Sequence, residues 1–358
     1  MATYKLDLSK RSDEILKFEE SLKKSVIGQD EAVDEVIKVY QSYLAGMKTP
    51  HKPLGNFLFL GPTGVGKTLL VESVANVVKS DLIKINCAEY SDTHHTNNLT
   101  GSPLGYVNRD DDPVITQKKL DKNKPSVVLF DEIEKSSHTL WNLLLGITDK
   151  AELNTNKGSV DFSQSFIFFT SNVGSDELSR LHSGLGFNNT VVENDKIKSI
   201  STSALAKKFP PEFVNRMDSI VVFNSLSEQN IRKILSVETG LVQGRILLSD
   251  TPFVVYYTES AREFLSKDGY DPKYGARHLK RTIERNIVSP LTIFMSSKQV
   301  GFGDLVTVDY KNNEFDFEVT VAGAVSAVVA AKENIRAMME EKEVKSRKKR
   351  LEFVNPGV

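Results

Sequence analysis

A glycine-rich segment of eight residues limits the possible folds of this chain more than any other feature. Residues 61–68 read Gly-Pro-Thr-Gly-Val-Gly-Lys-Thr, which matches the pattern G-x-x-x-x-G-K-[ST]. A short apolar run, Asn56–Leu60, precedes the segment, and a helical pattern, Thr68–Lys79, follows it. Glycines let consecutive backbone N–H groups turn inward around phosphate oxygens, and a helix start adds a favourable dipole. The segment therefore predicts a strand–loop–helix unit that binds phosphate; the alternative is a glycine-rich turn without a ligand.

Apolar strands alternate with helices along the first two-thirds of the chain. Two amphipathic helices, Ser12–Lys24 and Glu31–Met47, are expected before the first strand. The later strands are predicted at Leu82–Asn86, Ser126–Phe130, Ser165–Thr170 and Ser219–Phe223, with a helix at Ser136–Asp149. Short apolar runs separated by helices are typical of a mainly parallel sheet covered on both faces. The fold class is therefore α/β.

The pattern changes near residue 226, where we expect a domain boundary. A long helix is predicted at Glu228–Leu247, and a second, amphipathic one at Arg277–Met295, in which Pro290 favours a kink. A hairpin around Asn312-Asn313 is expected to follow, which makes this part a small α+β unit. The predicted organisation is an N-terminal helical lead-in (1–24), a large domain (25–226), a small C-terminal domain (227–321) and a helical, basic tail (322–358).

Composition excludes several classes of protein. The 358 residues carry 46 Lys and Arg against 47 Asp and Glu, so no strong positive field favours nucleic acid or an anionic membrane. The single cysteine, Cys87, rules out an intramolecular disulfide, and the N-terminus has no apolar signal core. The apolar run Ala322–Ala331 is about half the length that crosses a bilayer. We expect a cytoplasmic protein without membrane contact, whose basic run Lys345–Arg350 is a solvated tail, nucleic-acid or acidic-partner contact being the alternative.

Charged and hydroxyl side chains near two strand ends supply the chemistry that a nucleotide needs. Lys67 is expected to reach the β- and γ-phosphates of ATP, and the Thr68 hydroxyl is expected to ligate Mg²⁺. Asp131 and Glu132 follow the strand Ser126–Phe130, at the edge where parallel sheets bind ligands. Asp131 should hold Mg²⁺ through water, and Glu132 should polarise the attacking water as a general base. The alternative is that both acids cap the next helix, because acids favour helix N-termini.

Three further polar residues carry less information by themselves. Asn172 follows the strand Ser165–Thr170 and could orient the attacking water or touch the γ-phosphate, but its spacing alone favours a turn residue. Arg216 and Arg277, taken alone, are ordinary surface arginines.

Seven motifs in a fixed order make the sequence similar to the AAA+ ATPases of the Clp unfoldase/disaggregase family. The similarity runs from about Ser25 to Val321, and the chain most resembles the second, C-terminal ATPase module of the two-ring members. This resemblance implies a P-loop NTPase parallel sheet with flanking helices, plus a small α+β lid domain. The motifs are Val26–Gln29, Gly61–Thr68, Gly105–Val107, Leu129–Lys135, Thr170–Gly174, Glu212–Asp218 and Tyr274–Arg281.

The resemblance also implies roles that spacing could not. Asn172 would be the first sensor of the γ-phosphate, and Arg277 would be the second sensor, reaching the site from the small domain of the same chain. Arg216 would be the arginine finger, which enters the neighbouring subunit's site in a homo-hexameric ring. The implied catalytic residues are Glu132, Arg216, Asn172 and Arg277. ATP would be bound by Val26 and Ile27 at the adenine and by Gly61, Pro62, Thr63, Gly64, Val65, Gly66, Lys67, Thr68 and Asp131.

Two loop motifs concern partners of the family. Gly105, Tyr106 and Val107 would face the central pore of the ring, where Tyr106 would grip an unfolded polypeptide substrate; the alternative is a surface turn. An aromatic side chain offers contact area that tolerates any sequence. Leu185, Gly186 and Phe187 resemble the loop that docks a Clp-type peptidase, although three such residues recur often by chance and an ordinary exposed loop is the alternative.

The sequence also departs from the family's pattern. Asn108–Pro113 replaces the glycines that usually follow the pore motif, and this stiffens and recharges the loop. The chain is expected to lack a first ATPase ring, the coiled-coil insertion and an N-terminal adaptor domain. The function predicted is an ATP-dependent protein unfoldase or chaperone, with a partner peptidase left open. The alternatives are a nucleotide-gated assembly scaffold and an ATPase that remodels one specific partner without threading.

Overall fold

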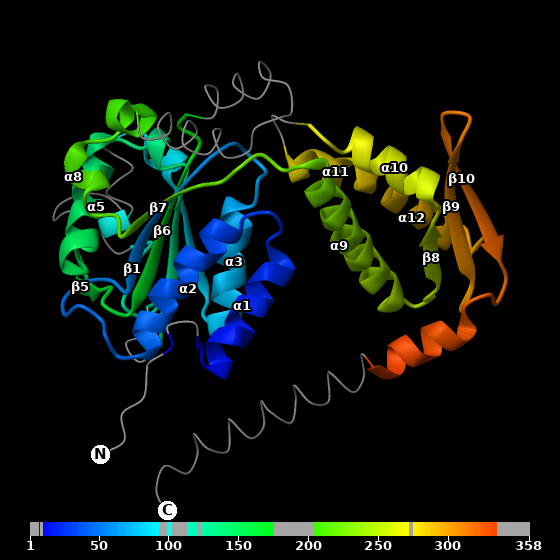
Figure 1. Ribbon diagram of the computed structural model, residues 1–358, viewed down its shortest axis with the longest axis horizontal. Coiled ribbons are helices and arrows are strands. Elements are labelled where there is room, and N and C mark those ends of the chain that lie inside the picture. Colours follow the sequence, from blue (N-terminus) through cyan, green and yellow to red (C-terminus); the bar gives the residue numbers. More distant parts are fainter. Residues whose placement is uncertain are drawn as a thin grey trace, which may run out of the picture. The chain divides into compact units, whose positions relative to one another are not determined.

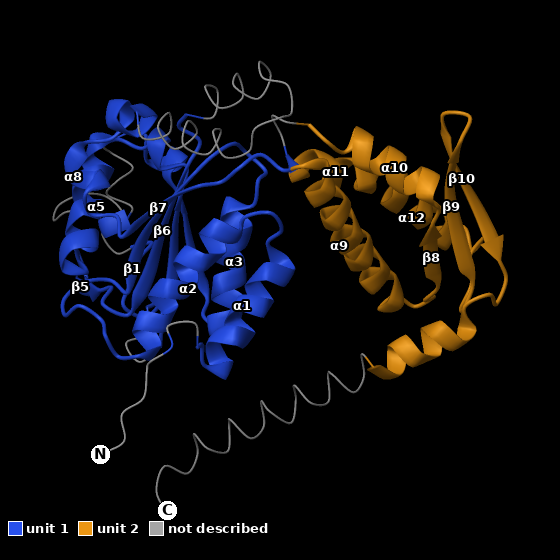
Figure 2. Ribbon diagram, viewed as in Figure 1, with its two compact units in different colours: residues 1–226, 272–275 blue, residues 227–271, 276–358 orange. Residues whose placement is uncertain are grey.

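The computed structural model describes residues 7, 10–92, 99–101, 113–120, 124–174, 203–271 and 275–334. The chain forms two compact units, each treated separately below. The first contains residues 1–226 and 272–275, and the second contains residues 227–271 and 276–358 (Figure 2).

A five-stranded parallel sheet forms the centre of the first unit. Its strand order is β2-β3-β6-β1-β7, so strands distant in sequence lie side by side (Figure 1). The phosphate loop follows the inner strand β1, in line with the predicted α/β fold with a parallel sheet. The strands are β1 (Gly55–Leu60), β2 (Leu82–Asn86), β3 (Ser126–Asp131), β6 (Ser165–Ser171) and β7 (Ser219–Val222).

The three middle strands are buried on both faces, which explains their continuous apolar sequences. Alternate residues of β1, β3 and β6 pack into two separate cores. Phenylalanine rings dominate one of them: the ring centroids of Phe57 and Phe168 lie 4.8 Å apart, and those of Phe59 and Phe223 lie 5.0 Å apart. This burial makes the sheet a rigid base for the loops at its edge.

Helices cover both faces of the sheet (Figure 1). The N-terminal helices α1 (Asp13–Ser25) and α2 (Asp30–Leu44) share one core with α3 (Lys67–Val78), which follows the phosphate loop. The other core contains residues of α5 (His138–Lys150) and α8 (Pro211–Val214). The remaining elements of this unit are the 3₁₀ helices η1 (Cys87–Tyr90) and η2 (Ile133–Lys135), the hairpin strands β4 (Glu152–Thr155) and β5 (Gly158–Asp161), and a helical segment at 203–208.

The second unit packs helices against a three-stranded sheet of order β10-β9-β8. Strands β8 and β9 are parallel, and β9 and β10 form the predicted hairpin. Its turn residues Asn312 and Asn313 have φ angles of 51° and 64°, as a type I′ turn requires. The elements are α9 (Glu228–Leu247), β8 (Val254–Tyr257), α10 (Glu259–Asp268), α11 (Ala276–Ile283), η3 (Glu284–Val288), α12 (Ser289–Ser296), β9 (Leu305–Lys311), β10 (Glu314–Thr320) and a helical segment at 325–334.

One predicted helix is divided in the structure, and one hairpin of the structure was not predicted. The helix expected at Arg277–Met295 is divided by a π-helical turn, η3, just before Pro290. Proline cannot donate a backbone hydrogen bond and its ring crowds the carbonyl four residues earlier, so a wider turn accommodates it. The hairpin β4–β5 was not predicted, because its strands are four residues long and mostly exposed, and lack a clear apolar alternation. Among the described helices, none has the length and apolar character needed to cross a bilayer.

Adjacent leucines on α3 offer a matched test of this packing. Leu70 is 0% exposed in the core beneath the sheet, whereas Leu69 is 41% exposed. Leu70→Ala should lower the free energy of unfolding by about 2–5 kcal/mol, because it removes buried methyl groups and leaves a cavity. Leu69→Ala should change it by less than about 1 kcal/mol. Urea denaturation measures both, and equal effects would contradict the assigned orientation of α3.

Candidate functional site

The phosphate loop has a backbone that only glycine can adopt at one position. Gly61, Gly64 and Gly66 have φ angles of 137°, 78° and 108°, in the region that disfavours other residues. A Cβ atom on Gly61 would lie 2.6 Å from the carbonyl oxygen of Phe223. The loop therefore turns tightly between β1 and α3, as the glycine spacing predicts.

The side chain of Lys67 lies over this loop. It is only 8% exposed, and its Nζ donates to the carbonyl oxygens of Gly61 and Pro62 and to Oδ1 of Asn172, the last at 2.9 Å. All three acceptors are neutral, and a phosphate oxygen is a stronger acceptor for an ammonium group. Lys67 is thus placed to exchange these bonds for bonds to phosphate.

Asp131 ends β3 and is fixed by two neighbouring strands. Lys84 of β2 forms an ion pair with Asp131 Oδ2 at 2.9 Å, and the Thr170 hydroxyl of β6 donates to Oδ1. The parallel register places these strand ends side by side. Asp131 therefore already pairs with a cationic group. This is the behaviour expected of a carboxylate that binds magnesium.

Glu132 adopts a left-handed backbone conformation, with φ of 59° and ψ of 47°. Its N–H donates to Thr170 Oγ1 at 3.1 Å, and its Oε2 forms an ion pair with Lys135 at 2.7 Å. The hydrogen bond from Lys135 to the Glu132 carboxylate raises the pKa of Lys135. A non-glycine residue in this region stores about 1–3 kcal/mol of strain, and such strain concentrates at functional sites.

Asn172 links the lysine to a carboxylate that the sequence analysis gave no role. Its backbone N and its Nδ2 both donate to Glu134 Oε1, at 3.2 and 3.3 Å. Because Asn172 Oδ1 accepts from Lys67, the three side chains form a continuous chain of hydrogen bonds. The spacing taken alone favoured a simple turn residue, but the structure places Asn172 in direct contact with Lys67.

The predicted adenine-pocket residues lie beside the loop. Val26 is buried in the same core as Val65, and a Cβ on Gly66 would lie 4.0 Å from Val26 Cγ1. Gln29 is 4% exposed; its Nε2 donates to the carbonyl oxygen of Val65 at 3.2 Å and to that of Asn224 at 2.9 Å. Gln29 therefore ties the phosphate loop to the end of β7.

Arg216 lies at the end of the sheet opposite the phosphate loop, near the start of β1. Its carbonyl oxygen accepts from Asn56 Nδ2 at 3.2 Å, and Asn56 stands near the start of β1, whereas the phosphate loop follows the end of that strand. Five residue steps along β1, from Asn56 to Gly61, separate the two by about 16–17 Å, more than an arginine side chain can span. Its guanidinium pairs with Asp149 at 2.5 Å, so the structure does not bring Arg216 to the phosphate loop of its own chain.

The other predicted residues are placed as follows. Ile27 and Thr68 are half-buried beside the residues already described, and Arg277 is exposed on α11 of the second unit. The pore motif and the docking motif lie outside the described residues: Gly105, Tyr106, Val107, Leu185, Gly186 and Phe187.

Sequence reasoning missed four residues that hold this site together. Lys84, Thr170, Glu134 and Gln29 contact Asp131, Glu132, Asn172 and the loop respectively. Three of them fall inside the quoted motifs, which was the available signal. Lys84 had no such signal, because its pairing depends on the register of β2 with β3.

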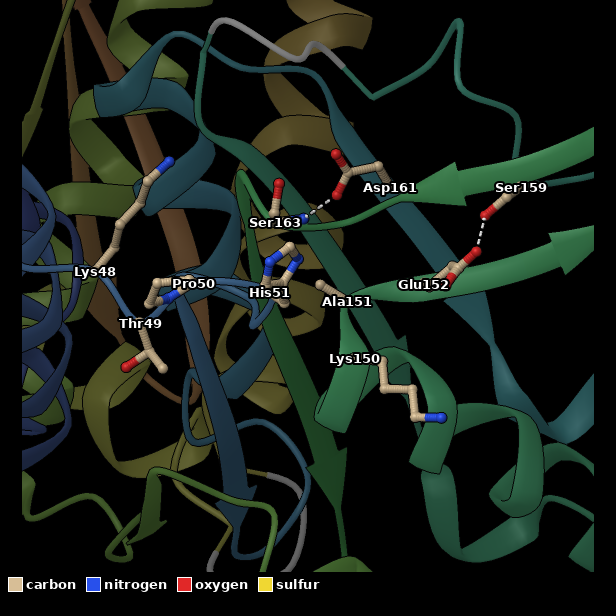
Figure 3. A pocket seen from close by; sticks show the side chains of 10 residues that line it. All are labelled: Lys48, Thr49, Pro50, His51, Lys150, Ala151, Glu152, Ser159, Asp161 and Ser163. Carbon is tan, nitrogen blue, oxygen red and sulfur yellow. Dashed lines mark hydrogen bonds between the residues drawn. The ribbon is translucent and has the colours of Figure 1, made fainter.

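A separate cavity of about 400 Å³ opens between the segment entering β1 and the β4–β5 hairpin (Figure 3). Its polar groups form local bonds: Ser159 donates to Glu152 at 2.6 Å, and the Ser163 N–H donates to Asp161 at 2.8 Å. None of the residues predicted to act lines it. The lining residues are Lys48, Thr49, Pro50, His51, Lys150, Ala151, Glu152, Ser159, Asp161 and Ser163.

A phosphate loop after β1, with acids at the end of β3 on the other side of β6, defines an AAA-type nucleotide-binding domain. Comparison with known families agrees: the AAA domain (Cdc48 subfamily) matches residues 52–220, and the C-terminal D2-small domain of ClpB protein matches residues 226–308. The chain belongs to the Clp family of AAA+ ATPases, and it matches their C-terminal ATPase module. The AAA domain at residues 52–220 is the ATPase domain of the Clp ATPases, which are enzymes that hydrolyse ATP.

Similar proteins cover most of this chain. The ATP-dependent Clp protease ATP-binding subunits ClpC of Staphylococcus aureus and Staphylococcus epidermidis are each 36% identical over 86% of the chain. The chain spans only 38% of the length of these relatives. A closed-state cryo-EM reconstruction of Hsp104 with ATPγS and FITC-casein is 30% identical, with a TM-score of 0.75, covering 86% of this chain and 52% of that one.

The residues present fit a magnesium–nucleotide complex. The backbone at Gly61 leaves no room for a side chain, Lys67 supplies an ammonium group, and Asp131 ends β3, which is separated from β1 by β6. Magnesium usually takes one or two protein ligands and completes its shell with water and phosphate oxygens, so Asp131 and the Thr68 hydroxyl would suffice.

Removal of the loop lysine tests this assignment. Lys67→Ala should weaken ATP binding by about 10- to 100-fold, because charge-assisted hydrogen bonds contribute about 1.5–3 kcal/mol. Titration with a fluorescent ATP analogue measures the affinity, and a melting curve checks the fold. The matched control is Lys38→Ala on the exposed side of α2, which should bind normally. Unchanged affinity in Lys67→Ala would contradict the phosphate-loop assignment.

Proposed function

We propose that this chain is an Mg²⁺-dependent ATPase whose hydrolysis, in a homo-hexameric ring, pulls on protein substrates. The proposal is supported by one observation: hydrogen bonds connect Lys67, Asn172 and Glu134. These side chains lie at adjacent strand ends, close to Asp131 and Glu132. These are the positions where a P-loop enzyme needs a phosphate-binding cation, a metal-binding acid and a base.

Each group has a distinct role in the proposed reaction. Lys67 binds the β- and γ-phosphates, while Thr68 and Asp131 hold Mg²⁺, which neutralises charge on the phosphates. Glu132 polarises the attacking water. Its side chain is 35% exposed, so water can reach it, and the hydrogen bond from its N–H to Thr170 Oγ1 holds its strained backbone at the strand end. Lys135 must release Glu132 before the carboxylate can act as a base.

In the proposed ring, a neighbouring subunit supplies the arginine that a chain cannot bring to its own phosphate loop. Arg216 lies about one strand length from its own phosphate loop, so we propose that it acts as an arginine finger in the site of a neighbouring copy. An arginine supplied in trans contributes about 10³–10⁵ in rate and makes hydrolysis depend on assembly. Arg277 is proposed as the sensor from the small domain.

Protein is the proposed substrate. The ClpC relatives are described as subunits of an ATP-dependent protease, and the Hsp104 structure contains casein. Tyr106 is proposed to grip the polypeptide, with Gly105 and Val107 beside it. Leu185, Gly186 and Phe187 are proposed to dock a Clp-type peptidase, with an ordinary exposed loop as the alternative. If casein fails to stimulate ATP turnover, a nucleotide-gated scaffold is the better description.

A mixing experiment tests the shared site directly. Arg216→Ala keeps its own catalytic base and lacks a finger, whereas Glu132→Gln keeps its finger and lacks the base. Each variant alone should lose at least about 10²-fold in turnover per subunit, since both groups act on the transition state. Mixed in equal amounts, they should regain turnover, because an Arg216→Ala site can receive the finger of a Glu132→Gln neighbour.

The concentration dependence of the wild type completes this test. Turnover per subunit should rise with protein concentration as rings assemble, and Arg245→Ala, an exposed arginine of α9, should behave as the wild type does. Two inactive variants that stay inactive when mixed, together with a flat wild-type rate, would contradict the in-trans site.

The gripping role predicts a separation of activities. Tyr106→Ala should keep the basal ATPase rate within about twofold, because the proposed grip acts on the polypeptide and not on nucleotide, and should lose the unfolding of a fluorescent protein substrate. Tyr106→Phe keeps the aromatic area and should retain most unfolding activity. Unfolding that survives in Tyr106→Ala would remove the residue from this role.

A further inference from the structure

We propose that Glu134 is a positioning residue that fixes which end of the Asn172 amide faces Lys67 and the phosphate loop. Glu134 lies in the 3₁₀ helix η2, two residues after Glu132. The kinetic consequence of this proposal rests on the proposed ATPase activity, but the orientation itself does not.

The contacts place Asn172 between a pure acceptor and a pure donor. Glu134 Oε1 accepts from Asn172 Nδ2 at 3.3 Å and from its backbone N at 3.2 Å. On the other side, Lys67 Nζ donates to Asn172 Oδ1 at 2.9 Å. The backbone bond also holds the end of β6 against η2.

Chemistry permits one orientation of the amide here. The two ends of an asparagine side chain have nearly equal size but opposite hydrogen-bonding character. An ionised carboxylate can only accept and an ammonium group can only donate. The reversed amide would set oxygen against oxygen at Glu134 and N–H against N–H at Lys67. Glu134 therefore directs the carbonyl end of Asn172 toward the phosphate loop.

This polarity limits what Asn172 can do. A carbonyl oxygen can accept from Lys67 or from a water molecule, but it cannot donate to a phosphate oxygen. Through Oδ1, Asn172 therefore orients Lys67 or the attacking water, and any bond from Asn172 to a phosphate oxygen would have to come from the second N–H of Nδ2.

The second oxygen of Glu134 indicates that the carboxylate is retained at a cost. Its Oε2 is buried and has no hydrogen-bond partner among the residues that the structure describes. A buried oxygen without a partner is unfavourable by about 1–3 kcal/mol. An unfavourable buried oxygen of this kind is retained where the side chain has a role in a functional site. The fixed Asn172 amide requires a side chain at position 134 that only accepts hydrogen bonds.

Kinetics separate positioning from a merely structural role. Glu134→Ala should lower kcat by about 10- to 100-fold, because a small misplacement at a reacting centre has effects of this size. KM for ATP should change by less than about threefold, since phosphate binding rests on Lys67 and the loop. Glu134→Gln retains one acceptor oxygen and should recover much of the loss. Glu152→Ala, an exposed glutamate of the β4–β5 hairpin, is the matched control.

A double variant tests whether Glu134 acts through Asn172. Glu134→Ala combined with Asn172→Ala should be no slower than Asn172→Ala alone, because the positioned group is already gone. Additive losses, or a Glu134→Ala enzyme with normal kcat, would overturn the proposal. A wild type without any turnover would refute the proposed function instead.

A second measurement needs no turnover. In the ¹⁵N spectrum of the nucleotide-free full chain, the Asn172 side-chain amide is identified by its loss in Asn172→Ala. Its protons should exchange slowly with water, and the signal should shift and exchange faster in Glu134→Ala, with melting curves confirming the fold. An unchanged signal would overturn the proposed orientation whether or not the protein hydrolyses ATP.

Discussion

The register of β6 between β1 and β3 is the constraint on which the site depends. Leu60 pairs with Ser171 on one side, and Phe130 pairs with Phe169 on the other. This register places the Thr170 hydroxyl against Asp131 and sets the following residues of β6 beside the phosphate loop. Because side chains alternate along a strand, a slip of one residue would turn Thr170 to the other face and separate these groups. The phenylalanine-rich core that fixes β6 is therefore also what aligns the groups proposed to act in catalysis.

Ion pairs at the strand ends orient groups more than they stabilise the fold. Lys84 with Asp131 and Lys135 with Glu132 are partly exposed pairs, and pairs of this kind contribute about 0–1 kcal/mol. Each nevertheless places an acid where the proposed chemistry needs it. Magnesium bound at Asp131 would compete with the ammonium group of Lys84 for the same carboxylate. Binding of the magnesium–nucleotide would thus rearrange this pair without disturbing the core.

The sequence predicted those parts of the molecule that local pattern determines. Glycine spacing located the phosphate loop, apolar runs located the strands of the sheet, and Asn312-Asn313 located a hairpin turn. What it could not predict depends on tertiary contact. Gln29 reaches Val65 and Asn224 across 36 and 195 residues of sequence, and no local window contains such a bond. The pairing of Lys84 likewise follows from strand order, which periodicity does not specify.

The length of β1 has a consequence for how hydrolysis is controlled. It separates Arg216 from the phosphate loop of the same chain, and both ends of the strand are anchored, by Asn56 at one and by the tight turn at Gly61 at the other. No side-chain rotation can close a gap of about 16–17 Å. If Arg216 contributes to hydrolysis, it must therefore do so in a second copy, and in that case breaking its bond with Asp149 becomes part of assembly. The rigid sheet would then make the activity of each site depend on its neighbour, without any need for a flexible element inside the large domain.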